Sequence, residues 1–439
     1  MTLLRLQDLL SGKTVARHYS LYKQTQWYSE EQIREFQMQK LLRLLNHCYN
    51  NVPYYQRIMR DLSLHPNDFR TPEDIVRLPI LTKEMVIQNS KELTPDNIEN
   101  IKGVKSSYTG GTTGGALLKR NDAATRSSIW GAYYRFYDWM GIKRSDGKID
   151  LMAGYSLNPT KLSKRIASWL IDKTSNSYTF DTYAPIQENL ERLNELLGKR
   201  KIKLLRSYTQ YLYTIASELR QRGYCYNVKS IMTTAEPLFP EHRVLFQEVF
   251  GAEVFDQYGC GEIGGIAFEC DHHEGLHVTE ERVILETGET GELIITDLDN
   301  LALPLIRYSN ADEAEVCQHR CGCGRKSKLI KQIRGRVIDY LTGPAGQTLH
   351  SSYLWKIIYE TNIGPLRNLV KFQAVQNEVD KILLRIVAQR FTKEEENLLS
   401  RLLKEKLGPV DIEYKYEANI ENSSSGKYRP VINNLLKRN

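Results

Sequence analysis

The chain has 439 residues, of which 41% are hydrophobic and 26% charged, so it can bury a sizeable core and is long enough for two or three globular domains. Its formal charge of +7 is mild for this length and suits an anionic substrate, and no basic run interleaved with aromatic residues indicates a nucleic-acid partner. No run of about eighteen uncharged apolar residues occurs, and the N-terminal MTLLRLQDLLSGK carries charge too early for a signal peptide, which predicts a cytoplasmic protein without a transmembrane segment.

The first hundred residues are predicted to be helical. The stretch EEQIREFQMQKLLRLLNHCYNNVPYY has apolar residues at helical spacing until Pro53, which should end that helix. Between about residues 145 and 335, short apolar runs alternate with helical patterns, which predicts an α/β domain with a largely parallel or mixed sheet. The apolar runs are IDLMAG, KIKLLRSY, SIMTTAE, AEVFDQYG and GELIITDL, and the helical patterns are NLERLNELLGK and PEHRVLFQEVF.

The character of the chain changes after Asp339. The runs VKFQAVQ, ILLRIVA and DIEYKYE predict strands, and TKEEENLLSRLLKEKLG predicts a helix that begins at a capping box of Thr392 and Glu395 and ends at Gly408. A compact α+β unit of this size is predicted to be a separate small domain. We therefore expect an N-terminal domain at 1–335, helical over about 1–100 and α/β over about 100–335, and a C-terminal domain at 336–439.

The stretch 108-YTGGTTGGALLKR-120 concentrates glycines and threonines directly before apolar and basic residues. A glycine-rich turn lets consecutive backbone N–H groups converge on one point, and threonine hydroxyls add donors, so such a loop can bind a polyphosphate. It is not a Walker loop, because no Gly-Lys-Ser/Thr follows at the right spacing. From the glycine content alone, a flexible surface loop is as good an interpretation of this stretch as a phosphate-binding loop.

Five more short segments follow this loop, in the order 233-TTAEPL-238, 256-DQYGCGE-262, 303-LPLIRYSNAD-312, 335-GRVID-339 and 425-SGKYR-429. With 109-TGGTTG-114 in front of them, the chain resembles the adenylate-forming enzyme superfamily, and within it the phenylacetate–CoA ligase-like branch that includes the CapK-like capsule-biosynthesis proteins. The resemblance extends upstream through NVPYY and RLPILTKEM, so it covers nearly the whole chain. It implies a large AMP-binding domain, a hinge and a small mobile C-terminal lid domain.

The resemblance also implies a role for each segment. The glycine-rich loop binds the ATP phosphates through Thr109, Gly110, Gly111, Thr112, Thr113 and Gly114. Tyr258 stacks on adenine, Glu262 binds Mg²⁺ on the phosphates, and Asp312 binds the ribose hydroxyls. Asp339 is the hinge, and Lys427 is the catalytic lysine. The other nucleotide-binding positions of the motifs are Ala235, Glu236, Asp256, Gln257, Gly259 and Arg336.

The sequence departs from the family pattern in two of these motifs. Gly115-Ala116 replaces the Lys-Pro or similar ending of the glycine-rich loop, and Gly261 stands where a hydroxyl residue is commoner. Two plainer roles are the alternatives to the implied ones: Asp312 could cap a turn, and Lys427 could be a solvated loop lysine.

The chemistry explains why these residue types are needed. Joining a carboxylate to the α-phosphate of ATP brings two anions together, so the transition state needs cations and donors already in place. Lys427, the magnesium on Glu262 and the threonine-rich loop would supply them. Pyrophosphate then leaves, and a thiol such as coenzyme A or an amine attacks the mixed anhydride after the C-terminal domain has rotated about Asp339.

The acyl-substrate pocket is implied at 154-GYSLNP-159 and 206-RSYTQ-210, with Tyr155 and Tyr208 as its candidate residues. Tyr155 stands where the family frequently has arginine, and Thr209-Gln210 where it frequently has Pro-Ser, so phenylacetate itself is not implied as the substrate. An acyl or amino-acid donor used in surface-polysaccharide decoration is at least as consistent with the CapK-like members. The aromatic stretch 130-WGAYYRFYDWMG-141 has helical spacing and is interpreted as core.

The seven cysteines form an odd set crowded toward one region, which favours reduced thiols or a metal over a disulfide framework. The runs 270-CDHHEGLH-277 and 317-CQHRCGCGR-325 combine thiols on tight turns with imidazoles, which are typical ligands of structural zinc. Similar pairs occur in the CapK-like branch, and we predict a zinc site of Cys270, His273, Cys321 and Cys323, with His277 or Cys317 as substitutes. Unmetallated surface thiols are the alternative. Cys260, inside the nucleotide motif, is interpreted as a small packing residue.

Three functions follow from the sequence. The leading one is an ATP-dependent ligase that forms an acyl-adenylate, with Mg²⁺ as cofactor and coenzyme A, another thiol or an amine as acyl acceptor. An adenylyltransferase that stops at the AMP adduct is the alternative enzyme. A zinc-stapled binding protein without catalysis is the third, because Gly115, Gly261 and Tyr155 depart from the family pattern.

Overall fold

The computed structural model describes residues 8, 14–108, 117–153, 176–181, 186–289, 291–317, 319–336, 340–350, 354, 357–358, 361, 363, 367, 369–421 and 429–435. The loop from Thr109 to Gly114, Tyr155, Asp339 and Lys427 lie outside the described residues. The chain divides into two units, which are Met1–Lys143 with Phe255–Ile333, and Arg144–Val254 with Arg334–Asn439. The expected mobile domain at 336–439 stays a prediction.

Of the helices described, none combines the length and the apolar character needed to pass through a lipid bilayer.

The N-terminal part of the first unit is helical, as its sequence predicts. Helix α3 (Glu30–Asn51) begins at a capping box, in which Ser29 Oγ accepts from the Gln32 N–H and the Gln32 side chain accepts from the Ser29 N–H. It ends before Pro53, which opens α4 (Pro53–Asp61) because proline fits the first turn of a helix. The other helical elements are α2 (Val15–Thr25), α5 (Lys83–Gln88), α6 (Ala123–Trp139), η1 (Pro66–Asp68), η2 (Pro72–Arg77) and η3 (Ile98–Asn100).

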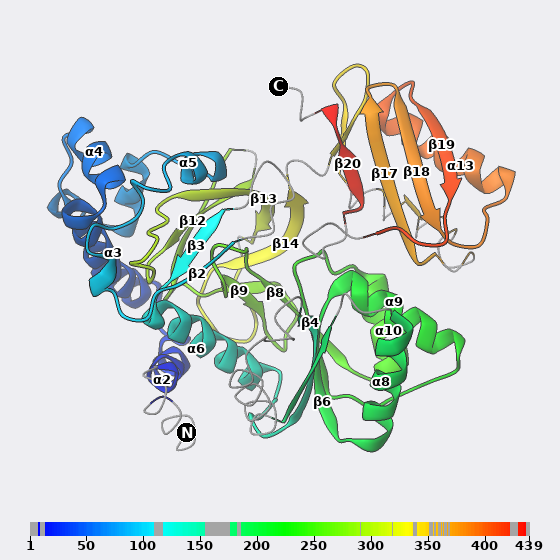
Figure 1. Cartoon of the computed structure of the whole chain (residues 1–439), viewed down its shortest axis with the longest axis horizontal. Coiled ribbons are helices and arrows are strands. Elements are labelled where there is room, and N and C mark those ends of the chain that lie inside the picture. Colours follow the sequence, from blue (N-terminus) through cyan, green and yellow to red (C-terminus); the bar gives the residue numbers. More distant parts are fainter. Residues whose placement is uncertain are drawn as a thin grey trace. The chain divides into compact units, whose positions relative to one another are not determined.

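A largely antiparallel sheet forms the rest of the first unit. Its strands lie in the order β11-β12-β13-β14-β10-β9-β8, and the short β1 (Leu81–Thr82) pairs with β13. Their bounds are β8 (Glu253–Tyr258), β9 (Ala267–Glu269), β10 (Leu276–Val278), β11 (Val283–Thr287), β12 (Glu292–Asp297), β13 (Tyr308–Val316) and β14 (Leu329–Arg336). A separate hairpin, β2 (Lys105–Tyr108) with β3 (Leu118–Asn121), brackets the glycine-rich stretch (Figure 1).

The second unit contains the predicted alternation of strands and helices. Strands β4 (Gly147–Ala153), β5 (Ser177–Asp181), β6 (Ile202–Tyr208) and β7 (Ser230–Thr234) lie in the order β7-β6-β4-β5, and the pairs β4–β5, β4–β6 and β6–β7 are parallel. Helices α8 (Ile186–Lys199), α9 (Thr209–Gln221) and α10 (Pro240–Phe250) pack on one side of β4 and β6, where they bury Leu193, Leu212 and Phe246 (Figure 1). The α/β interpretation is confirmed.

The C-terminal part of the second unit has its own four-stranded sheet, in the order β19-β18-β17-β20. Helix α13 (Lys393–Leu407) begins at the predicted capping box, ends at Gly408, and buries Leu399, Leu403 and Leu407 in the same core as the sheet. The strand β20 was not predicted, and it pairs parallel with β17. The strand bounds are β15 (Tyr340–Thr342), β16 (Thr348–His350), β17 (Lys371–Glu378), β18 (Lys381–Val387), β19 (Asp411–Tyr416) and β20 (Val431–Asn433).

A buried ionic network joins the helices of the first unit to its sheet. Arg282 is fully buried, its Nε lies 3.4 Å from Asp299 Oδ2, and its Nη2 lies 3.6 Å from Asp297 Oδ1. Lys40 of α3 reaches the other oxygen of Asp299 at 2.5 Å. Burial alone would raise the pKa of Asp299, but Lys40 and Arg282 together lower it to about 2. The two cations therefore keep this buried carboxylate charged.

The network predicts a large stability effect of Arg282→Met. The substitution removes the one guanidinium that contacts both carboxylates, and Lys40 alone then faces Asp297 and Asp299. Breaking a buried ion pair by removing one partner costs about 3–5 kcal/mol. We expect a decrease of that size in the free energy of unfolding, measured by urea denaturation.

Arg34→Met is the control. Arg34 pairs with Glu73 at 2.7 Å, but both side chains are more than half exposed, so water replaces the lost partner. Little change in the unfolding midpoint is expected. Equal effects of the two substitutions would show that the buried network does not stabilise the fold.

Candidate active site and metal centre

The hairpin that brackets the glycine-rich stretch lies against the turn after β8. Its strands are in register up to the pair Tyr108 and Leu118, so the two residues that flank the glycine-rich stretch are neighbours. Lys119 of β3 donates from Nζ to the backbone carbonyl of Gly261 at 2.9 Å. Two motifs that are 142 residues apart in the chain thus meet at the base of the predicted phosphate loop.

The end of β8 is hydrogen-bonded to β13. Tyr258 is buried, and its hydroxyl donates to Asp312 Oδ2 at 2.8 Å. Asn310 donates from Nδ2 to the Tyr258 hydroxyl at 2.9 Å and to Asp312 Oδ2 at 2.7 Å. Burial raises the pKa of Tyr258 well above its usual value and the Asp312 carboxylate raises it further, so the phenol stays a donor at neutral pH. The carboxylate that is predicted to bind ribose is therefore held by two donors.

The remaining residues of 256-DQYGCGE-262 have structural partners. The Asp256 N–H donates to Glu269 at 2.7 Å, and Gln257 accepts from Tyr133 at 3.2 Å. Gly259 lies against the backbone of Gly265, where an added Cβ would be 3.1 Å from the Gly265 nitrogen. Glu262 is half-buried at the end of this turn.

Cys260 fits the packing role predicted for it. Its thiol accepts from the Ile263 N–H at 3.3 Å, and its side chain packs against the main core of the first unit. Burial raises the pKa of Cys260, with a further increase from Glu262, so the group stays a protonated thiol rather than a nucleophilic thiolate.

In the second unit, 206-RSYTQ-210 and 233-TTAEPL-238 meet at the carboxyl ends of two adjacent parallel strands. Tyr208, which is half-buried, pairs in register with Thr234. Glu236 accepts from the Gln210 N–H at 2.8 Å, and Ala235 has a positive φ of 68°. Carboxyl ends of parallel strands are where α/β proteins bind ligands, which supports the position predicted for both segments. The side chain of Arg336 lies outside the described residues.

Four of the predicted zinc-binding groups converge in the first unit. The ligand atoms of Cys270, His277, Cys321 and Cys323, here called the tetrad, lie within 4.8 Å of one another. The Cys270 and Cys321 sulfurs are 3.6 Å apart, and Cys323 Sγ is 3.3 Å from His277 Nε2. A tetrahedral zinc ion with bonds of about 2.0–2.3 Å needs ligand separations of roughly 3.4–3.8 Å. The tetrad is therefore of the right size and chemistry for zinc.

The structure corrects the predicted histidine. His273 has its Nδ1 3.1 Å from Glu269 Oε1 and is not part of the tetrad, nor is Cys317. His277, predicted only as a substitute, takes the place because β10 holds it between β9 and β14, opposite Phe268 and Leu329. Its Nδ1 is hydrogen-bonded to Ser327 Oγ at 2.9 Å, which leaves Nε2 directed at the thiols.

The thiols of the tetrad differ in their surroundings. Burial raises the pKa of Cys270 and of Cys321. Burial also acts on Cys323, but backbone and side-chain hydrogen bonds from Arg325 outweigh it and lower the pKa of that thiol. Arg325 is thus positioned to stabilise a thiolate at one corner of the tetrad.

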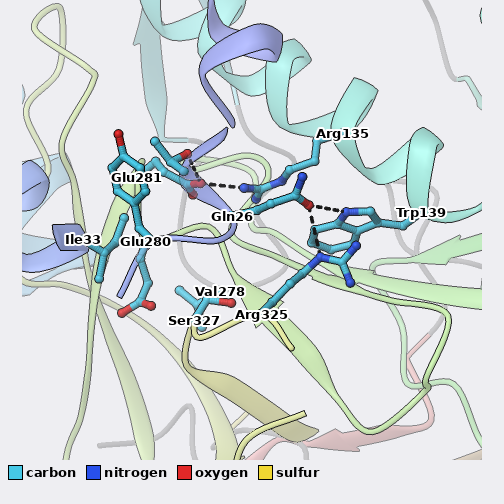
Figure 2. Close-up of a pocket in the computed structure, with 11 residues that line it drawn as sticks. Gln26, Ile33, Arg135, Trp139, Val278, Glu280, Glu281, Arg325 and Ser327 are labelled. Carbon is cyan, nitrogen blue, oxygen red and sulfur yellow. Dashed lines mark hydrogen bonds and ion pairs between the residues drawn. The ribbon is translucent and has the colours of Figure 1, made fainter. Parts of the chain in front are cut away.

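A small polar pocket lies beside the tetrad (Figure 2). Arg325 donates from Nε to Gln26 Oε1 at 3.1 Å, and Trp139 donates from its indole N–H to the same oxygen at 2.9 Å. The Arg325 guanidinium lies over the Trp139 ring, 4.3 Å from its centroid, and the Trp139 ring contacts His277 at 5.6 Å. The residues that line this pocket include Trp139, Arg325 and Ser327, each of which contacts a side chain of the tetrad.

Sequence reasoning missed Lys119 and Asn310. The basic pair at the end of 108-YTGGTTGGALLKR-120 was a signal for Lys119, although nothing in the sequence indicated its contact with Gly261. Asn310 lies inside a recognised motif, two residues before Asp312, and its role follows only from the turn of the backbone at Ala311, where φ is 61°.

Known proteins resemble the chain in sequence and in fold. Residues 341–434 match the family model of the CapK C-terminal domain. The chain is 24% identical over 332 residues to the phenylacetate-coenzyme A ligase of Thermus thermophilus, which covers 71% of this chain and 72% of that protein. It is 26% identical over 340 residues to the phenylacetate-coenzyme A ligase of Escherichia coli, with coverage of 71% and 73%.

The fold is that of 2-hydroxyisobutyryl-CoA ligase, whose structure in complex with R3-HIB-AMP matches with a TM-score of 0.72 at 18% identity, over 90% of this chain and 88% of that one. In sequence, the chain is thus similar to the ATP-dependent adenylate-forming ligases of the phenylacetate–CoA ligase-like, CapK-like branch.

Proposed function

We propose that the protein activates a carboxylic acid with ATP and transfers the acyl group from the resulting acyl-adenylate to coenzyme A, another thiol or an amine. The main observation in support is that the phosphate-loop hairpin, the turn ending at Glu262 and the Asp312 carboxylate are brought together by contacts of Lys119 and Tyr258. The relatives named as coenzyme A ligases support the choice of acceptor.

In the first half-reaction, a carboxylate oxygen attacks the α-phosphorus, and the bond from that phosphorus to the bridging oxygen breaks so that pyrophosphate leaves. Asp312 accepts hydrogen bonds from the ribose hydroxyls, with its orientation held by Tyr258 and Asn310. Glu262 offers Mg²⁺ the carboxylate oxygens that this ion prefers, next to the carbonyl that Lys119 binds. Bound Mg²⁺ neutralises charge on the phosphates.

Lys427 and the loop from Thr109 to Gly114 supply the remaining positive charge and donors in this proposal. Both are assigned from the resemblance of 425-SGKYR-429 and 109-TGGTTG-114 to family motifs. In the second half-reaction the C-terminal domain turns about Asp339, Lys427 leaves the site, and the acceptor attacks the acyl carbon with release of AMP. We assign the product to surface-polysaccharide biosynthesis from the resemblance to the CapK-like branch, whose C-terminal domain model matches residues 341–434.

We further propose that the tetrad holds a structural zinc ion. Three thiols and one imidazole satisfy the four positions of a tetrahedral ion, so no position is left open for activating water. The hydrogen bond of His277 to Ser327 and the contacts of Arg325 are the supporting interactions that such sites require.

Pyrophosphate release across a panel of carboxylic acids tests the reaction itself. With ATP and the correct acid, we expect release that increases when coenzyme A or the true amine acceptor is added. Release that no acceptor stimulates would favour an adenylyltransferase. No release with any acid would contradict the ligase proposal.

Lys427→Ala tests the two-step assignment. If the ammonium acts only during adenylation, its loss should slow acid-dependent pyrophosphate release by about 10²–10³, or roughly 3–4 kcal/mol, as for loss of one preorganised donor. Transfer from a supplied acyl-adenylate should continue at nearly the native rate. Asp339→Pro should have the opposite effect, with adenylation retained and transfer impaired.

Lys393→Ala is the matched control, because the Lys393 side chain is 78% exposed and lies on the first turn of α13. It should change neither half-reaction. Unaffected pyrophosphate release in Lys427→Ala would show that this loop does not carry the catalytic lysine.

His277→Ala tests the metal centre against the sequence-based choice of histidine. Purified protein is expected to hold about one zinc ion per chain, and His277→Ala should lose it and melt at a lower temperature, because structural zinc contributes folding energy. His273→Ala should keep both the ion and the melting temperature, since His273 pairs with Glu269 instead. Metal analysis by mass spectrometry decides, and retention of zinc in His277→Ala would refute the tetrad.

A further inference from the structure

A second group of metal-binding side chains adjoins the tetrad. The ligand atoms of His272, Glu274 and Cys321, here called the outer triad, lie within 4.8 Å of one another. The side chains of His272 and Glu274 are 43% and 38% exposed, whereas Cys321 is buried. Cys321 therefore belongs to both groups, with the tetrad on its buried side and the outer triad toward solvent. We infer that the outer triad is a second metal position, which shares the Cys321 thiolate with the tetrad and takes a divalent cation of the zinc or cobalt type.

The Glu274 carboxylate is oriented for this role by the backbone. Its Oε2 accepts from the Gly322 N–H at 3.1 Å, and its Oε1 lies 3.8 Å from His272 Nδ1. Zinc bonds to nitrogen and to carboxylate oxygen are about 2.0–2.2 Å long, so an ion between these atoms requires them to close by only a few tenths of an ångström. Glu274 Oε2 is thus fixed by the Gly322 N–H, and Glu274 Oε1 lies beside the His272 imidazole.

Gly322 leaves the space that the two ligand atoms occupy. A Cβ at this position would lie 3.1 Å from Glu274 Oε1 and 3.2 Å from His272 Nδ1, closer than nearly all Cβ contacts in proteins. Because Gly322 also donates the hydrogen bond that fixes the carboxylate, the same residue makes room for the pair and orients it.

The chemistry of the ligand atoms also suits a second cation. The inference rests on the proposed zinc in the tetrad. Glu274 would be the anionic ligand that belongs to the second ion alone. A thiolate retains lone pairs after it binds one ion, so Cys321 can bridge two, and the mixed nitrogen, oxygen and sulfur set suits zinc or cobalt better than magnesium or calcium.

The test is equilibrium dialysis of the full-length protein against increasing concentrations of zinc or cobalt, with metal per chain measured by mass spectrometry. Wild type should take up a second ion at higher concentration, and the double variant H272A/E274Q should bind only the first. The double variant H273A/D271N is the matched control. It removes one histidine and one acid from the same turn, neither of which belongs to the outer triad, and it should still bind two ions.

The outcomes separate the two proposals. One ion in both wild type and H272A/E274Q overturns the outer triad and leaves the tetrad intact, whereas no bound ion at all overturns both. Two ions in both proteins would show that His272 and Glu274 are not the ligands. The second cobalt ion should also increase the thiolate-to-cobalt absorption, because it binds Cys321, and an unchanged absorption would overturn the shared thiolate. Gly322→Ala should weaken uptake of the second ion alone.

Discussion

The pairing of β10 with both of its neighbours is the constraint on which the metal centre and the nucleotide motif depend. Leu276 lies opposite Glu269 of β9 on one side and Ile330 of β14 on the other. This register places the turn that follows β9, the side chain of His277 and the turn before β14 at one end of three strands. Gly275 permits it, because an added Cβ would lie 2.8 Å from the Ile330 carbonyl. Strand β9 in turn pairs with β8, so Tyr258 is held opposite Ala267 by the same ladder.

Polar groups around Asp312 are arranged before any substrate arrives. The Tyr258 hydroxyl and the Asn310 amide both donate to Asp312 Oδ2, and the Asp312 N–H donates back to Asn310 Oδ1 at 3.1 Å. Donors fixed in this way cost no reorganisation when a ligand binds. The tetrad is supported in a similar way, because Ser327 orients His277 of β10 and Arg325 stabilises the thiolate of Cys323 in the turn before β14.

Local features of the fold were predictable, and contacts between distant segments were not. The capping box at Thr392 and the end of α3 before Pro53 depend on a few neighbouring residues, so sequence patterns identify them. Strand β20 is a short run whose partner is β17, and its existence depends on that pairing rather than on its own composition.

In the candidate site, too, local patterns were predictable and contacts between distant segments were not. Cysteine spacing predicts the two segments that supply the tetrad, but the choice between His273 and His277 depends on which one a strand holds between β9 and β14. His273 has a positive φ of 54° in the turn after Cys270, which directs it to Glu269. The contact of Lys119 with Gly261 could not be read from either segment alone, because it exists only when the hairpin and the turn are folded together.

The position of Trp139 makes it an optical reporter of the metal centre proposed at the tetrad. Its ring contacts His277 and carries the Arg325 guanidinium on its face, while its N–H is fixed by Gln26. An indole at this distance from a metal ligand loses fluorescence when an open-shell ion such as cobalt replaces zinc, because energy passes readily between close neighbours. The chain has five tryptophans, so quenching of the part of the emission that comes from Trp139 would follow metal exchange in real time, without a label.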